Sequence, residues 1–129
     1  MEHTKDFLNL LLDRRSCRAF QPDPVDRPTL AAIVEAGRYA PSAMNIQKNH
    51  FYIITDPALL TQLTETVSRK LEGFAGRDFR YGAPALVLVT NRKRNTMALQ
   101  DASCAMENMM LAAYSMGVGS CWINQPFHL

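Results

Sequence analysis

The longest helical pattern in the sequence spans residues 97–116 and constrains the fold more than any other segment. Its apolar side chains recur at helical spacing and include Met106, Met109, Met110 and Ala113. Gly117 follows directly, in the position of a C-terminal cap. A chain of 129 residues suffices for one domain with a core, but so small a domain can hardly cover this face alone. We therefore expect part of the helix to pack against a second copy of the chain.

Three further helices are predicted before this one, each from a start signal and an apolar stripe. The start signals are Thr4, Asp26 and the pair Asp56-Pro57. Val25 and Leu30 fit a hydrophobic staple around the second start. The three stripes are Phe7, Leu8, Leu11 and Leu12; Leu30, Ile33, Val34 and Gly37; and Leu60, Leu63, Val67 and Leu71.

Three short apolar runs predict strands over residues 51–54, 85–89 and 120–123, and the first two are expected to be buried. The order is therefore two helices, then strand, helix, strand, helix and strand. This order favours an α+β or mixed α/β domain with a central sheet flanked by helices. Because no repeat or linker interrupts the pattern, we expect a single domain over residues 1–129.

Composition excludes several classes of protein. Hydrophobic residues make up 47% of the chain and charged residues 20%, which is typical of a soluble globular protein. The net charge of +2 does not favour a nucleic-acid binder, and no apolar run approaches the roughly 20 residues that span a membrane. The polar N-terminus is not a secretory signal, and the three scattered cysteines suggest neither disulfides nor a zinc site. We expect a cytoplasmic protein without a metal.

A dense basic cluster follows the first predicted helix. Three arginines and a serine lie within five residues, as Arg14, Arg15, Ser16 and Arg18. Such fixed charges and donors suit a phosphate and a second electron-rich group. Taken alone, the cluster favours a solvated basic turn whose arginines pair with local carboxylates. A nucleic-acid surface that also uses residues 92–94 is a weaker alternative, because the chain lacks an aromatic-rich basic stripe.

A polar loop joins the second predicted helix to the first strand. It contains Pro41, Ser42, Asn45 and Gln47. Short uncharged polar groups of this kind can form hydrogen bonds near the edge of a cofactor. Taken alone, however, they favour an ordinary turn, because proline, serine and asparagine are common turn residues.

A third segment follows the long helix. Gly117 and Gly119 would let the chain approach a ligand closely, and Trp122, Ile123 and Asn124 come next. Each feature has a structural alternative. A tryptophan is equally typical of a core, and glycines after a helix are common C-terminal caps.

Together and in this order, the segments Arg14–Phe20, Ala40–Gln47 and Gly117–Asn124 resemble the flavin-binding segments of the nitroreductase family. The resemblance covers nearly all of the chain. It implies FMN as cofactor, NAD(P)H as reductant and a nitroaromatic, quinone or similar small molecule as acceptor, in a ping-pong cycle. FMN is favoured over FAD because the sequence has no Gly-x-Gly-x-x-Gly fingerprint. No side chain is expected to act as a catalytic acid or base, because the flavin carries the chemistry.

The resemblance also implies a role for each segment. Arg14, Arg15 and Ser16 would bind the flavin phosphate, and Arg18 would reach the N1/C2 edge of the ring. The loop at 41–47 would approach the flavin from the partner subunit of a homodimer. Residues 122–124 would run beside the ring, with a backbone N–H near N5.

Members of the family continue beyond the tryptophan strand. They add a helix, a terminal strand that crosses to the partner, and further basic contacts to the phosphate. This sequence stops at Leu129, so we expect the domain to lack the family's C-terminal segment. The alternative function is therefore a flavin-binding or flavin-free dimeric remnant with little turnover.

Overall fold

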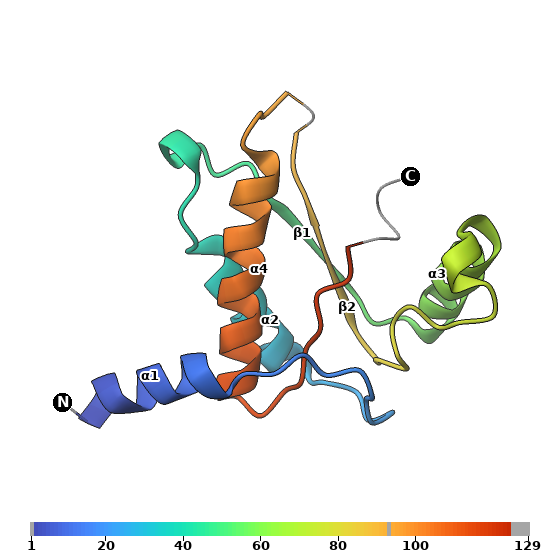
Figure 1. Ribbon diagram of the computed structural model, residues 1–129, viewed down its shortest axis with the longest axis horizontal. Coiled ribbons are helices and arrows are strands. Elements are labelled where there is room, and N and C mark those ends of the chain that lie inside the picture. Colours follow the sequence, from blue (N-terminus) through green and yellow to red (C-terminus); the bar gives the residue numbers. More distant parts are fainter. Residues whose placement is uncertain (1, 93, 125–129) are drawn as a thin grey trace.

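The structure is a computed structural model that describes residues 2–92 and 94–124. Helices and strands alternate along the chain after two initial helices, and α2 and α4 lie to one side of a small sheet whose end leads to α3 (Figure 1). The elements are α1 Glu2–Asp13, α2 Arg27–Arg38, η1 Ala43–Asn45, β1 His50–Ile54, α3 Pro57–Lys70, η2 Glu72–Phe74, β2 Leu86–Thr90 and α4 Ala98–Ser115. This content confirms the α+β class predicted from the sequence.

The longest helix, α4, is the centre of the packing. Ile33 of α2 shares a buried cluster with Met109 and Ala113 of α4. The apolar stripe predicted for α2 is confirmed, because Leu30, Ile33 and Gly37 are all buried. Gly37 has a particular role at this contact: a Cβ placed there would lie 2.7 Å from the Met109 Cγ. The missing side chain therefore allows α2 and α4 to approach closely.

The described sheet has two antiparallel strands, β1 and β2, with Tyr52 opposite Leu88. Phe51 and Val89 pack against the α4 cluster. The prediction that both strands are buried is wrong: Tyr52 and Ile53 are 54% and 42% exposed, and each residue of β2 is half-buried. The reason is that α4 covers one face of a narrow sheet, which leaves the other face and the β1 edge in solvent.

The strand predicted for residues 120–123 is also wrong within the described chain. A single parallel bridge joins Ser16 to Ser120, and the Cys17 N–H donates to the Ser120 carbonyl over 2.8 Å. A strand requires a ladder of such bonds, and one bridge does not provide it. The segment nevertheless meets the residues that follow α1 at this bridge (Figure 1).

The first helix starts before its expected cap and has an uncovered apolar face. α1 begins at Glu2, so Thr4 lies inside the helix rather than at its N-cap. Neither Glu2 nor His3 breaks a helix. The exposed apolar side chains of α1 are Phe7, Leu8, Leu11 and Leu12. Figure 1 shows α1 projecting from the C-terminal end of α4, away from the rest of the chain. An apolar face of this kind is typical of a surface that contacts another protein.

Two of the predicted N-caps are confirmed by position. Asp56 caps α3, and its side chain accepts a hydrogen bond from the Ala58 N–H over 3.1 Å. Asp26 occupies the N-cap of α2, although its side chain makes no cap bond to a described residue. Its extended backbone alone therefore marks the start of that helix.

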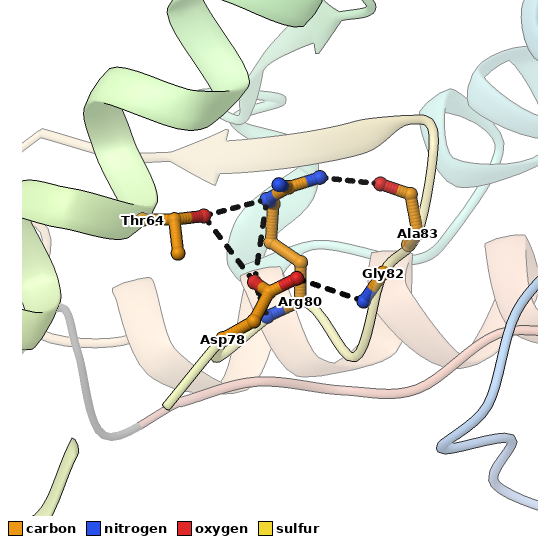
Figure 2. Close-up of polar contacts among 5 residues, drawn as sticks. All are labelled: Thr64, Asp78, Arg80, Gly82 and Ala83. Atoms are coloured by element: carbon orange, nitrogen blue, oxygen red, sulfur yellow. Dashed lines mark hydrogen bonds and ion pairs between the residues drawn. The ribbon is translucent and has the colours of Figure 1, made fainter. Parts of the chain in front are cut away.

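A polar network around Arg80 fixes the loop between α3 and β2 (Figure 2). The guanidinium donates from Nε to Thr64 Oγ1 over 2.8 Å and from Nη1 to the Ala83 carbonyl over 2.6 Å. Asp78 accepts from the backbone N–H groups of Arg80 and Gly82, each over 2.9 Å. The side chains thus close the loop on itself and anchor it to α3 before the chain enters β2.

Gly117 ends α4 as the sequence predicts. Its φ of +75° is in the left-handed region. The Val118 N–H donates to the Ala113 carbonyl over 2.9 Å, and the Gly117 N–H donates to the Tyr114 carbonyl over 3.1 Å. This pair of bonds is a Schellman motif, which satisfies carbonyls at the end of the helix. It also turns the chain toward residues 118–124.

We predict that Gly117→Ala lowers the free energy of unfolding by about 1–2 kcal/mol, the cost of a left-handed non-glycine residue. A steric contribution is not expected, because a Cβ at this position meets nothing within 4 Å. Gly73→Ala is the matched control, since a Cβ there is equally free and no left-handed φ is required. Urea unfolding measures the free energy of unfolding of both variants. Equal losses in the two would contradict the role given to Gly117.

Candidate functional site

A cavity of about 710 Å³ lies between α4, β2 and the segment 117–124. Its walls are largely apolar and include Phe20, Leu86, Met106, Met109, Val118 and Trp122. Four residues just after α1 contribute one side: Cys17, Ala19, Phe20 and Gln21. A largely apolar space bordered by a few polar groups is typical of a site for a small organic ligand.

Arg14 directly follows α1 and contacts α4. Its Nε lies 3.8 Å from Glu107 Oε1 on α4. Its Nη1 is buried and has no hydrogen-bond partner among the described residues. A buried donor without a partner is costly. This nitrogen is therefore suited to an anionic group from outside the chain.

The other members of the basic cluster are exposed. Arg15 Nη1 donates to the Leu12 and Arg14 carbonyls, each over 3.0 Å. These carbonyls lie at the C-terminal end of α1, where a cation is favourable. Ser16 pairs through its backbone with Ser120, and Arg18 is open to solvent. The three arginines therefore have three different environments, which their spacing in the sequence does not reveal.

The structure brings the arginine segment and the third segment together. Besides the Cys17–Ser120 hydrogen bond, Gly119 lies against Cys17: a Cβ on the glycine would be 3.1 Å from the Cys17 Cβ. Trp122 is 40% exposed, so it is not a core aromatic of the described chain. Ile123 is half-buried, and Asn124 is exposed.

The loop containing Pro41, Ser42, Asn45 and Gln47 lies elsewhere. The Ala43 N–H donates to Asp101 Oδ1 over 2.8 Å, and Asp101 is in the first turn of α4. Gly117 follows the last turn, so the two ends are roughly 24 Å apart at about 1.5 Å per residue. Figure 1 shows the loop and the arginine segment at opposite ends of α4. One chain therefore does not bring all three segments to one place.

The backbone of this loop is strained. Met44, Asn45 and Gln47 have φ values of 53°, 55° and 51°, in a region that residues other than glycine seldom adopt. Ser42 Oγ accepts from the Gln47 N–H, and Gln47 Nε2 donates to Asn45 Oδ1, each over 3.0 Å. Pro41 is exposed. Strain of this kind persists only where surrounding contacts hold it, and it is frequent at functional sites.

Asp101 is the residue that sequence reasoning missed, because it looks like an ordinary acid near the start of a helix. It is in fact the buried polar residue of the described core, with 3% of its surface exposed. Its position offered a signal: Asp101, Ala105 and Met109 are spaced four residues apart and so share one face of α4. An acid on the apolar face of a helix must be paired.

Among residues 2–92 and 94–124, no three His, Cys, Asp or Glu side chains gather in a group that could hold a metal ion. Within the same residues, no helix has both the length and the apolar character needed to cross a membrane.

Comparison with known proteins gives the site a context. A 123-residue alignment with an Archaeoglobus fulgidus protein, provisionally named NADH dehydrogenase/NAD(P)H nitroreductase, is 29% identical and covers 92% of this chain and 67% of that protein. A Methanothermobacter thermautotrophicus protein with the same name is 29% identical over 91% of this chain and 60% of its own length. The chain thus spans about two thirds or less of these two relatives.

A solved structure is also similar. The nitroreductase from Bacteroides fragilis, crystallised with bound FMN, has 36% sequence identity and a TM-score of 0.86. The match covers 92% of this chain and 70% of that one. The model of the nitroreductase family matches residues 11–128. Since this match takes in most of the sequence, the chain belongs to the nitroreductase family.

Proposed function

We propose that this chain forms an FMN-dependent oxidoreductase that takes NAD(P)H as reductant and a nitroaromatic, quinone or similar small molecule as acceptor. The observation that carries the proposal is the contact between the arginine segment and residues 117–124 beside the apolar cavity. The FMN bound to the Bacteroides fragilis nitroreductase supports the cofactor. The names of the two archaeal relatives support the reductant.

The residues of this chain fit FMN on three counts. Arg14 Nη1 is a buried donor that lacks a partner among the described residues, as a phosphate ligand should be before it binds. Gly119 lets the two segments that would hold the cofactor approach each other, because a Cβ there would lie 3.1 Å from the Cys17 Cβ. The cavity has apolar walls of the kind that accept a flat ring.

We assign the ligand contacts as follows. Arg14 and Ser16 bind the phosphate, and Arg15 joins them by exchanging its two carbonyl contacts for the anion. Arg18, which is open to solvent, places a fixed positive charge at the pyrimidine edge of the ring. Residues 122–124 line the ring and shield it from water.

When bound, FMN supplies the hydride chemistry, in a ping-pong cycle with NAD(P)H as donor and the acceptor as oxidant. The chain holds the cofactor, orients it and sets its electrostatic environment. A fixed cation near the pyrimidine edge favours the reduced cofactor, because charge develops there on reduction. No side chain is assigned the role of general acid or base.

The second part of the proposal is a twofold homodimer. In one chain the loop at 41–47 is anchored at the opposite end of α4 from the arginine segment. Pro41, Ser42, Asn45 and Gln47 therefore reach a flavin only on a partner. The exposed apolar face of α1 and the half-exposed sheet supply surface for such contact.

We predict that the purified protein binds FMN and that NADH or NADPH then bleaches the visible absorbance under anaerobic conditions. Fluorescence titration measures the binding, and absorbance measures the reduction. A protein that binds flavin without being bleached would instead support the alternative, a flavin-binding protein with little turnover. Absence of binding at high micromolar FMN would refute the cofactor assignment.

Two arginine substitutions should have different effects. Arg14→Ala should weaken FMN binding by about 1.5–3 kcal/mol, as expected for the loss of a hydrogen bond to a charged group. Arg18→Ala should chiefly lower the reduction potential of the bound cofactor, because the fixed charge near the ring is lost. Arg38→Ala is the matched control, since Arg38 is exposed on α2 and pairs with Glu35 over 2.7 Å. If titration and potentiometry show equal, negligible effects for all three, the cluster is a solvated basic turn.

The oligomeric state is a further prediction. Light scattering over a dilution series should show a dimer, because each copy leaves apolar surface exposed. The dimer should dissociate as the protein is diluted. The exposed α1 residue Leu12 gives a probe, and Leu12→Glu should shift the equilibrium toward monomer. A strictly monomeric protein that still binds FMN tightly would remove the loop at 41–47 from the site.

A further inference from the structure

We propose that Asp101 is a positioning residue for the cofactor site of the partner subunit, because it holds the loop 42–47 in its strained conformation. This inference rests on the proposed function, since the loop is assigned to the partner's flavin there. Asp101 itself touches neither cofactor nor acceptor in this scheme. It acts through the Ala43 N–H.

The first support is the way in which both oxygens of the carboxylate are used. Oδ1 accepts from the Ala43 N–H over 2.8 Å, and Oδ2 accepts from Asn95 Nδ2 over 3.0 Å. Both neighbours are donors at this contact. A carboxylate satisfies two donors at once, whereas an amide of the same shape presents one acceptor and one donor.

The second support is a closed ring of hydrogen bonds that fixes this carboxylate. Asn95 Nδ2 also donates to Asn91 Oδ1 over 3.1 Å, and Asn91 Nδ2 donates to Asn49 Oδ1 over 2.8 Å. Asn49 Nδ2 donates to the backbone carbonyl of Asp101 over 3.1 Å, which closes the ring. The ring joins the start of β1, the end of β2 and the first turn of α4. Asp101 is therefore held from three elements and forms a rigid anchor.

The third support is that the loop needs an anchor. Its bonds from Gln47 to Ser42 and Asn45 are internal, whereas the bond from Ala43 to Asp101 joins it to α4. Three left-handed residues are stable only where the surroundings impose them. Releasing Ala43 removes an external restraint, so the loop should relax to commoner conformations.

The test is Asp101→Asn, which keeps the volume of the side chain. Its amide N–H would face the N–H donor of either Ala43 or Asn95. In the flavin-free protein, amide hydrogen exchange at Ala43 should become at least tenfold faster. The Kd for FMN should rise at least tenfold. Asn108→Ala is the matched control, because Asn108 lies on the same helix and donates to the Ala36 carbonyl over 3.0 Å, away from the loop. The control should change both quantities less than twofold.

A double-mutant cycle distinguishes an effect of Asp101 through the loop from a merely structural role. If Asp101 acts through the loop, Asp101→Asn should raise the Kd less than threefold in a protein that already carries Asn45→Ala. A full tenfold effect in that background would overturn the proposal. Unchanged affinity in the single Asp101→Asn variant would overturn it as well, even with faster exchange. Failure of the unmodified protein to bind FMN would instead refute the proposed function, and the inference would fall with it.

Ala43→Pro tests the same bond from the loop if Asp101→Asn does not fold. Ser42 has φ −131° and ψ 153°, which suits a residue before proline. The proline removes the donor and leaves the carboxylate unchanged. The Kd for FMN should rise at least fivefold, and an unchanged Kd would overturn the proposal.

Discussion

Burial of one face of α4 is the constraint on which the rest of the structure depends. The α2 helix and both strands take their places by packing on this helix, and Arg14 after α1 pairs with its Glu107. The contact is close because Gly37 has no side chain opposite Met109. Once this packing is set, the two ends of α4 have different neighbours. Asp101 and the loop it binds lie at one end, and the Schellman turn at Gly117 directs the chain to the arginine segment at the other.

Short-range sequence signals made most of the helices predictable. The stripe from Leu30 to Gly37 repeats at helical spacing, and Asp56 before Pro57 is a strong start signal, so both helices appear where the sequence places them. The end of α4 at Gly117 was equally predictable, because that turn requires a left-handed residue and glycine adopts this conformation without strain. Burial was less predictable. Tyr52 and Ile53 are apolar enough for an interior strand, yet their exposure depends on how many elements cover the sheet.

The features that the sequence did not predict depend on contacts between residues far apart in the chain. The segment after Gly119 was expected to be a strand, but a strand depends on partners elsewhere in the chain, and in the described residues it finds only one bridge. The bond between Ala43 and Asp101 joins positions 58 residues apart, so nothing near Asp101 in the sequence announces it. The structure shows the contact between the arginine and glycine segments, which the sequence alone did not predict. The different environments of Arg14, Arg15 and Arg18 required the structure.

The position of two functional segments at opposite ends of one helix has a consequence for how this chain can change. Insertion of one residue within α4 would turn one end relative to the other by about 100° and lengthen the helix by about 1.5 Å. Asp101 would then leave the buried face, or Gly117 would direct the chain away from Cys17. Exposed loops that carry no such contacts can gain residues at little cost, but the length of α4 is fixed by the need to keep both ends in register. Variation in this helix should therefore take the form of substitutions rather than insertions or deletions.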